Sequence, residues 1–341
     1  MLSNLSRSLR IIIAIIVLFF IIETLLLLSN APSDAHFYNF NHSPPPAPTN
    51  ALDWSRFAYV QYVTNTPYLC NSVMLFETLN RLQSKADRIM MYPMKFSLDE
   101  NDNGTESRLL RKARDEYKVK LVPIEIQSRA SGDATWAESF TKLLAFNQTQ
   151  YDRVLSLDSD ATILQHLDEL FLLPSCPLAF PRAYWLNPDE RVMSSQLMLI
   201  QPSKFEFDRI MTAINTADRS DYDMEIVNDL YRDNALIIPH RPWTLLTGEF
   251  RNDDHSAYLG NKNETWNPDD VFKATKFLHF SDWPVPKPWI NPPSHIMDEK
   301  KPSCQKNATS GQLDDCRNRD YWLGIYADFA KRRKDVCDLT V

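Results

Sequence analysis

Glycine is scarce in this sequence: only 6 of its 341 residues are Gly. The loops that cradle phosphates in P-loop and dinucleotide-binding proteins need closely spaced glycines, so the sequence excludes both types. The sequence also has no run of five or more basic residues, and the formal net charge is −7, which argues against nucleic acid as a partner. A diphosphate ligand would therefore have to be bound by a metal ion and basic side chains.

The amino-terminal segment predicts a membrane anchor. Residues 11–28 are apolar apart from two positions, which is just long enough for a helix that spans a bilayer. Arg7 and Arg10 precede the run, so the positive-inside rule places residues 1–10 in the cytoplasm and everything downstream outside the cytosol. The alternative is a signal peptide cleaved near residues 29–31, although the apolar run is longer than the core of such a peptide.

The residues after the anchor have the features of a lumenal stem and domain. Residues 29–53 are polar and contain a proline-rich stretch at 44–48, which predicts an extended stem. By pattern, five asparagines are N-glycosylation acceptors: Asn41, Asn103, Asn147, Asn263 and Asn307.

Five cysteines follow the anchor, and an oxidising lumen would pair some of them. Three of the five lie in the tail at 300–341, so we expect a bridge within that tail, although spacing does not fix the connectivity. The odd count leaves one cysteine free or paired with another chain. The five are Cys70, Cys176, Cys304, Cys316 and Cys337.

Beyond residue 54, short apolar runs typical of strands alternate with the apolar spacing of helices. We expect strands at 57–64, 88–92, 119–124, 154–157, 177–181, 195–200 and 235–238. We expect helices at 68–81, from the end of a loop at 99–107 to about 117, and at 136–147, 208–217 and 223–231. This alternation predicts an α/β domain over 54–341 with a mostly parallel sheet.

Two carboxylates, Asp158 and Asp160, come directly after the buried strand at 154–157. Residues two apart on an extended backbone point to the same side, so the pair can converge on one cation. Oxygen ligands suit Mn²⁺ or Mg²⁺, and an incomplete shell leaves positions for substrate phosphates. An isolated Asp-x-Asp triplet is more often a solvated loop or a helix cap. Here the triplet would lie at the carboxyl end of a parallel strand, where α/β sheets bind ligands.

Three further side chains have the chemistry that such a site needs. A histidine on an apolar strand is usually a core residue, but beside an Asp pair His279 would be a suitable third ligand. Lys287 would offer a point charge to a phosphate. Lys142 lies off the apolar stripe of its helix, which on composition alone is typical of a solvated surface.

With these residues in view, the sequence resembles glycosyltransferase family 8, the glycogenin-like enzymes, and within it the fungal Golgi N-acetylglucosaminyltransferase branch. The resemblance extends over about 57–289. It rests on four segments: Tyr59–Asn65, Phe140–Leu143, Asp158–Thr162, and Leu278–Phe280 with Lys287–Trp289.

The resemblance implies a GT-A fold, which is Rossmann-like, and a retaining transfer of N-acetylglucosamine from UDP to a glycan hydroxyl in the Golgi lumen. The protein would be a type II membrane protein that binds a UDP-sugar donor and a glycan acceptor. The family's motifs assign Mn²⁺, with Mg²⁺ as the alternative, to Asp158, Asp160 and His279. They assign the uridine to Thr64, Asn65 and Tyr68, and the donor diphosphate to Lys287. Lys142 matches a lysine that approaches the donor.

The sequence departs from the family at two groups of positions that would contact the sugar. Ser194, Ser195 and Gln196 replace the usual Asn-Ser/Ala-Gly, and Met224 occupies the position of the family's Gln beside the anomeric carbon. Asp223 keeps the matched carboxylate, and Glu225 is a second catalytic candidate. The segment from His279 to Lys287 is also longer than usual.

Two alternatives follow from these departures. The donor would be UDP-glucose or UDP-galactose if the changed sugar contacts alter donor choice. A protein of another class, a lumenal glycan-binding or scaffold protein, would keep the fold without turnover. The intact Asp158, Asp160 and His279 argue against the second alternative, because a binding module does not need an open metal site.

Overall fold

The computed structural model describes residues 52–128, 138–186, 189–218, 220–290, 293–306 and 311–340. The predicted cytoplasmic residues 1–10, the anchor and most of the stem lie outside these residues, as do the sequons Asn41 and Asn307. Within the described residues, no helix combines the length and the apolar character of a membrane span. The side chains of Asn103, Asn147 and Asn263 are exposed.

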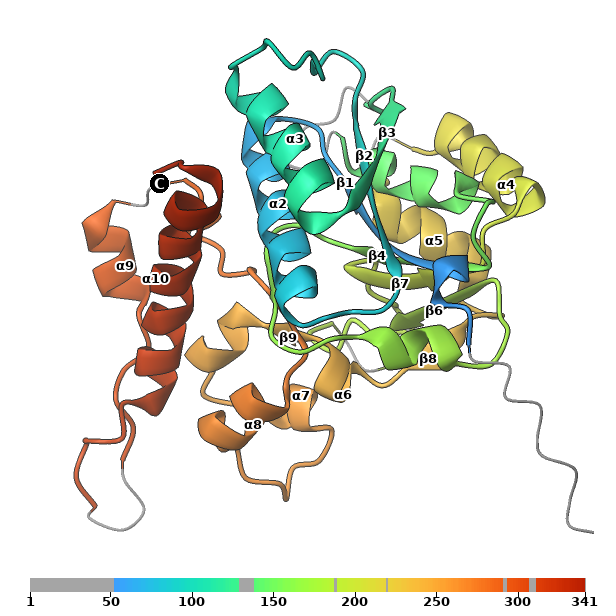
Figure 1. Cartoon of the computed structure of the whole chain (residues 1–341). Helices are drawn as coiled ribbons and strands as arrows, with labels where there is room; N and C mark the ends of the chain where they lie inside the picture. Colours follow the sequence, from blue (N-terminus) through green and yellow to red (C-terminus); the bar gives the residue numbers. More distant parts are fainter. Residues whose placement is uncertain are drawn as a thin grey trace, which may run out of the picture. The chain divides into compact units, whose positions relative to one another are not determined.

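A seven-stranded sheet forms the centre of the domain, with the strand order β3-β2-β1-β4-β7-β6-β8 (Figure 1). The first four strands of this order run parallel, and so do β6 and β8. β7 pairs antiparallel with both of its neighbours, so the sheet is mostly but not wholly parallel. The strands are β1 (Phe57–Tyr62), β2 (Asp87–Pro93), β3 (Val119–Ile124), β4 (Arg153–Leu157), β6 (Leu178–Pro181), β7 (Leu197–Ile200) and β8 (Leu236–Ile238).

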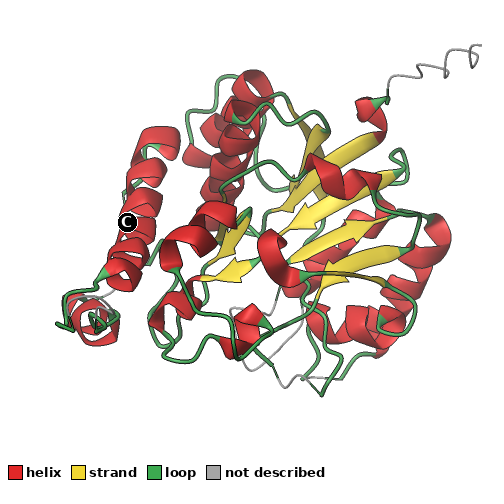
Figure 2. Cartoon of the chain, turned by 90° about the horizontal axis from the view of Figure 1, so that it is seen from below, coloured by secondary structure: helices red, strands yellow, loops and turns green. Residues whose placement is uncertain are grey.

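Helices cover both faces of this sheet, as Figure 2 also shows. On β1, Tyr59 packs into the core beneath α2 and α3, whereas its neighbours Ala58 and Val60 pack against η2, α4 and α5. This alternation is the two-residue period of a strand that is buried on both faces. The helices are η1 (Trp54–Arg56), α2 (Thr66–Arg81), α3 (Thr105–Tyr117), η2 (Ser139–Asn147), η3 (Asp168–Leu172), α4 (Lys204–Thr216), α5 (Asp223–Tyr231), α6 (His240–Trp243), η4 (Thr247–Arg251), α7 (Ser256–Leu259), α8 (Pro268–Ala274), α9 (Ser294–Lys300) and α10 (Arg317–Cys337).

A second, three-stranded sheet lies beside the end of β4 and has the order β5-β10-β9. Its strands are β5 (Ala161–Ile163), β9 (Leu245–Leu246) and β10 (Phe277–His279). His279 is paired with Ala161 on one side and with Leu246 on the other. Because β5 begins directly after Asp160, this small sheet brings His279 next to the Asp pair.

The carboxyl-terminal helix α10 packs against α2, and a disulfide between Cys70 and Cys337 joins them. The bridge predicted within the tail is confirmed as Cys304–Cys316. Cys176 is free.

Most predicted elements are confirmed within a few residues, and two need correction. The helix predicted at 136–147 is, in its described part, a 3₁₀ helix that begins at Ser139, and Trp136 lies outside the described residues. The loop predicted at 99–107 is shorter, because α3 begins at Thr105.

Candidate active site at the carboxyl end of β4

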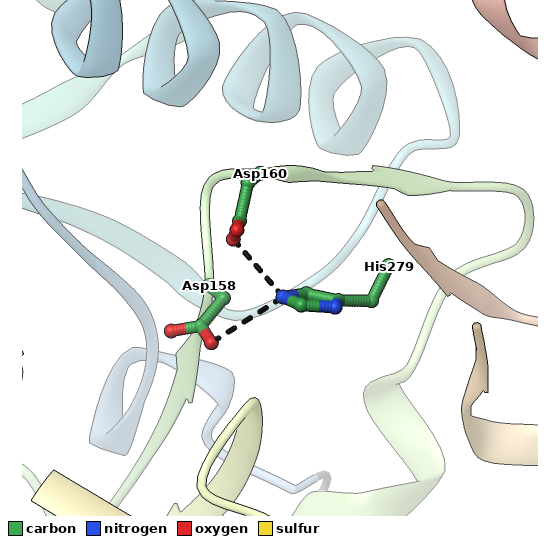
Figure 3. Close-up of side chains that lie close together, drawn as sticks. All are labelled: Asp158, Asp160 and His279. Atoms are coloured by element: carbon green, nitrogen blue, oxygen red, sulfur yellow. Dashed lines mark ion pairs between the residues drawn. The ribbon is translucent and has the colours of Figure 1, made fainter. Parts of the chain in front are cut away.

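The predicted metal ligands converge in the structure. The backbone of Asp158 donates to the carbonyl of Gln196 (2.9 Å), and the carbonyl of Asp160 accepts from the backbone of Phe280 (2.9 Å). These bonds tie the Asp pair to β7 on one side and to β10 on the other. His279 Nε2 lies 3.2 Å from Asp160 Oδ1 and 3.7 Å from Asp158 Oδ2 (Figure 3).

The three side chains fit a divalent cation. One ligand atom from each lies within 4.8 Å of the other two, and each side chain is only 13–14% exposed. Neither ring nitrogen of His279 makes a hydrogen bond within the described residues, so Nε2 is available as a ligand. Two carboxylates and an imidazole form a donor set that suits Mn²⁺. The predicted cluster is therefore confirmed, and the identity of its ion stays a prediction.

Lys142 is buried between two carboxylates and does not have the solvated position that composition alone suggests. Its Nζ lies 2.6 Å from Asp158 Oδ1 and 2.7 Å from Asp223 Oδ2. Burial favours the neutral amine, but the charges of Asp158 and Asp223 outweigh it and raise the pKa of Lys142. Lys142 is thus a fixed positive charge beside the cluster.

Lys287 occupies the corresponding position on the other side of the cluster. Its Nζ lies 2.6 Å from Asp160 Oδ2 and donates to the carbonyl of Phe280 (2.6 Å). Burial would raise the pKa of Asp160, but His279 and Lys287 hold it well below its usual range. Asp160 is therefore an ionised ligand.

The two candidate catalytic carboxylates differ in their surroundings. Asp223 begins α5 and faces Lys142. Burial acts to raise the pKa of Asp223, and Lys142 with the Ser195 and Ser139 hydroxyls lowers it below its ordinary value. Glu225 instead accepts a hydrogen bond from the backbone of Tyr222 (3.0 Å), which caps the first turn of α5. This hydrogen bond gives the Glu225 side chain a structural role. A catalytic role of Glu225 stays a prediction.

Ser195 and Gln196 line the same site from the start of β7. Lys142 Nζ lies 3.4 Å from the Ser195 carbonyl. Because Leu157 pairs with Leu197, Gln196 stands opposite Asp158, with its side chain on the same face. The Gln196 side chain is buried, and within the described residues neither atom of its amide has a hydrogen-bond partner. An unmade hydrogen bond costs about 1–3 kcal/mol, so a bound ligand that satisfies this amide would be stabilised.

The residues predicted to hold the uridine lie at the end of β1 and the start of α2. Asn65 caps α2 by accepting from the backbone of Tyr68 (3.2 Å), and Thr64 is buried. The Tyr68 ring packs edge-on against Trp289, with 5.0 Å between centroids. Burial and the charges of the Asp pair raise the pKa of Tyr68, which places it near the cluster.

Sequence reasoning missed Tyr62, the last residue of β1. Its ring lies 5.9 Å from Lys142 Nζ, and burial together with the charges of Asp158 and Asp223 raises the pKa of its hydroxyl well above the usual value. The position of Tyr62 in the sequence could have indicated that it lies near the site. Tyr62 ends a parallel strand next to β4, and such ends meet at one edge of the sheet.

Two curated proteins are similar to this chain in sequence. The chain is 58% identical to Glucose N-acetyltransferase 1 of Gibberella zeae over 84% of this chain and 64% of that protein, so it spans just under two thirds of that relative's length. It is 45% identical to Glucose N-acetyltransferase 1 of Aspergillus fumigatus, over 86% of this chain and 82% of that protein. No protein-family model matches the chain.

Two solved structures share the fold. The bifunctional glycosyltransferase WbbM superimposes with a TM-score of 0.51 and 14% identity, over 74% of this chain and 52% of that one. An active-site mutant of LgtC gives a TM-score of 0.50 and 12% identity, over 69% of this chain and 90% of that one. At this identity the likeness concerns the fold alone, and the predicted GT-A-like α/β architecture is confirmed.

Proposed function

This chain belongs to the Glucose N-acetyltransferase 1 family of glycosyltransferases, and we propose that it transfers N-acetylglucosamine from UDP to a hydroxyl of a glycan. The observation that carries the proposal is the cluster of Asp158, Asp160 and His279, with a lysine on each side. It lies where the mostly parallel sheet presents the end of β4, which is the usual ligand position in such sheets.

Asp158, Asp160 and His279 would hold Mn²⁺, or Mg²⁺ in its place. When bound, this ion would neutralise charge on the diphosphate as the bond to the sugar breaks. Two lysines of the chain add positive charge near the diphosphate. Lys287, a compact ammonium on a half-buried stem, binds a phosphate oxygen, and Lys142 offsets part of the negative charge of Asp158 and Asp223 at the buried face of the site.

We propose that the transfer retains the anomeric configuration, as the resemblance to family 8 implies. Stabilising the leaving UDP in this way does not require a protein nucleophile. Asp223 is ionised and held by Lys142, so its carboxylate is the acidic group available to orient the donor sugar. Glu225 is engaged in capping α5 and is the weaker candidate.

The identity of the donor sugar can be tested by replacing Gln196. Its buried amide offers both a donor and an acceptor. An acetamido group presents its N–H donor and its carbonyl acceptor on separate atoms and can meet both amide atoms at once, whereas a hydroxyl presents both functions from a single oxygen. We expect Gln196→Leu to reduce kcat/KM for UDP-N-acetylglucosamine at least tenfold relative to UDP-glucose. An unchanged ratio would remove Gln196 as the selecting residue and favour UDP-glucose or UDP-galactose as the natural donor.

We further propose that the chain is anchored in the Golgi membrane by residues 11–28, with its domain in the lumen. The exposed sequons and the two disulfides support an oxidising, glycosylating compartment. Endoglycosidase treatment of the full-length chain from fungal cells should increase its mobility, and Asn103→Gln should reduce that shift. A chain without glycans would contradict the lumenal location.

The function itself is tested by measuring UDP release. The purified full-length chain is incubated with UDP-N-acetylglucosamine, UDP-glucose and UDP-galactose and a glycan acceptor, with and without Mn²⁺. Asp160→Asn should abolish release. Asp152→Asn, an exposed carboxylate at the opposite end of the same strand, should not change it. Metal-dependent UDP binding without turnover of any donor would favour a binding or scaffold protein instead.

A further inference from the structure

The segment between His279 and Lys287 holds a buried carboxylate that the proposed function does not use. Asp282 lies in this segment, and its side chain is 1% exposed. A carboxylate this deeply buried is expensive unless its oxygens are fully hydrogen-bonded. Its partners therefore reveal what the segment is fastened to.

Donors from two elements surround Asp282. Trp322 Nε1 donates to Oδ1 (2.9 Å), and the Tyr326 hydroxyl donates to Oδ2 (2.8 Å), both from α10. The Thr247 hydroxyl on η4 also donates to Oδ2. Arg251 Nη1 lies 3.5 Å from Oδ1 and donates to the Asp282 carbonyl (2.8 Å). Four donor groups therefore hold this one residue in place.

Aromatic packing against α10 surrounds both ends of the segment. The Phe280 ring lies edge-on to Tyr326 and Phe329, with 5.4 and 5.0 Å between centroids. Beyond Lys287, Trp289 lies between Tyr68 of α2 and Phe329, at 5.0 and 6.3 Å. The helix α10 thus contacts the segment on either side of Asp282.

The fit against η4 is also tight. A Cβ at Gly248 would lie 2.6 Å from the Ser281 carbonyl, so only glycine lets η4 approach the segment this closely. Past Ser281, the backbone of Val285 donates to the Asp282 carbonyl (2.9 Å) and closes a turn that leads to Lys287. The position of the Lys287 ammonium against Asp160 therefore depends on where Asp282 is held.

We propose that Asp282 is a positioning residue. It fastens the segment 280–287 to α10 and η4, so that Lys287 keeps its place at the donor site. This inference rests on the proposed function, because it assumes that the site binds a UDP-sugar. It makes the carboxyl-terminal helix, which lies outside the motifs of the site, a working part of that site.

The test is a double-mutant cycle read out by calorimetric binding of UDP to the full-length chain in the presence of Mn²⁺. Asp282→Asn should weaken binding tenfold or more, as is typical for groups that orient metal-site residues. In a Lys287→Met background the same change should weaken binding less than threefold, because Asp282 acts through Lys287. Additive losses would mean that Asp282 only stabilises the fold, and would overturn the proposal.

Two further variants separate positioning from stability. Trp322→Phe removes one donor to Asp282 and keeps an aromatic ring, so it should weaken UDP binding about threefold or more while the protein stays folded. Asp269→Asn is the matched control, because Asp269 also accepts from a tyrosine of α10, Tyr321 (2.9 Å), but lies outside the segment. Its UDP affinity should equal that of the unmodified chain.

The outcomes distinguish this inference from the proposed function. If the unmodified chain binds UDP with Mn²⁺ and Asp282→Asn binds equally well, the inference alone fails. If UDP binds and the cycle is non-additive but no donor is turned over, the inference holds and the transferase proposal fails. If the unmodified chain does not bind UDP with Mn²⁺, both fail.

Discussion

Replacing Lys142 by methionine should be among the most costly single changes at the site. The Lys142 side chain is 4% exposed and pairs with two carboxylates at 2.6 and 2.7 Å. Methionine fills a similar volume but leaves Asp158 and Asp223 without their shared partner. Removing one member of a buried ion pair typically costs about 3–5 kcal/mol, and we expect a loss of that size in the free energy of unfolding at pH 7.

The loss should shrink as the pH falls. With Lys142 present, the pKa of Asp223 lies below its unfolded value near 3.9, so the stabilisation persists at pH 5 and is lost only at more acidic pH. Without Lys142, burial dominates and raises this pKa above the unfolded value. The variant then gains stability as protons bind on the way from pH 7 to pH 5, and its difference from the unmodified chain narrows.

Urea unfolding, followed by the fluorescence of the 8 tryptophans, measures the loss of stability at pH 7 and its decrease at pH 5. A chelator in the buffer keeps metal binding from contributing to the free energy of unfolding. Lys204→Met is the control, because Lys204 also pairs with a carboxylate but is 83% exposed, and its loss should stay within about 0.5 kcal/mol. A loss below about 1 kcal/mol for Lys142→Met at pH 7, or one that is the same at pH 5, would refute the ion-pair reasoning.

Two other changes test contacts that hold the carboxyl-terminal region against the rest of the domain: the approach of η4 to Ser281 and the disulfide between α2 and α10. Gly248→Ala must push the Ser281 carbonyl away, so it should lower the free energy of unfolding by about 1–3 kcal/mol and weaken UDP binding measured by calorimetry. Replacing both Cys70 and Cys337 by serine should cost about 2–4 kcal/mol in urea unfolding, whereas Cys176→Ser, at the free cysteine, should stay within about 0.5 kcal/mol.

The fold could be predicted from the sequence where local pattern and tertiary packing agree. The strand at 119–124 and the helix at 223–231 have the predicted bounds, because a short, mostly apolar run and helical apolar spacing are strong signals. The antiparallel direction of β7 could not be predicted, since its apolar run is the same in either direction. The tight 3₁₀ geometry of η2 was also hidden, because its apolar spacing suits an α-helix.

Site residues could be predicted where a short spacing carries chemistry. The Asp-x-Asp spacing fixes two ligands, and an imidazole on a strand supplies the third once the family resemblance is in view. The environment of Lys142 could not be predicted, because the two carboxylates that bury it come from β4 and α5, far apart in the chain. Asp282 was hidden for the same reason, since its partners lie on η4 and α10.

The two lysines explain how an acidic cluster can exist in the folded chain before any ligand arrives. Asp158 and Asp160 would repel each other if both were ionised and unpaired, and burial would then raise both pKa values. Lys142 pairs with the first and Lys287 with the second. His279 and Lys287 hold the pKa of Asp160 well below its usual range, whereas burial, which Lys142 offsets only in part, still raises the pKa of Asp158. The same ammonium groups are the ones that a diphosphate needs. Lysine-to-methionine changes at both positions should therefore weaken UDP binding as well as stability, whereas a surface lysine such as Lys204 should affect neither.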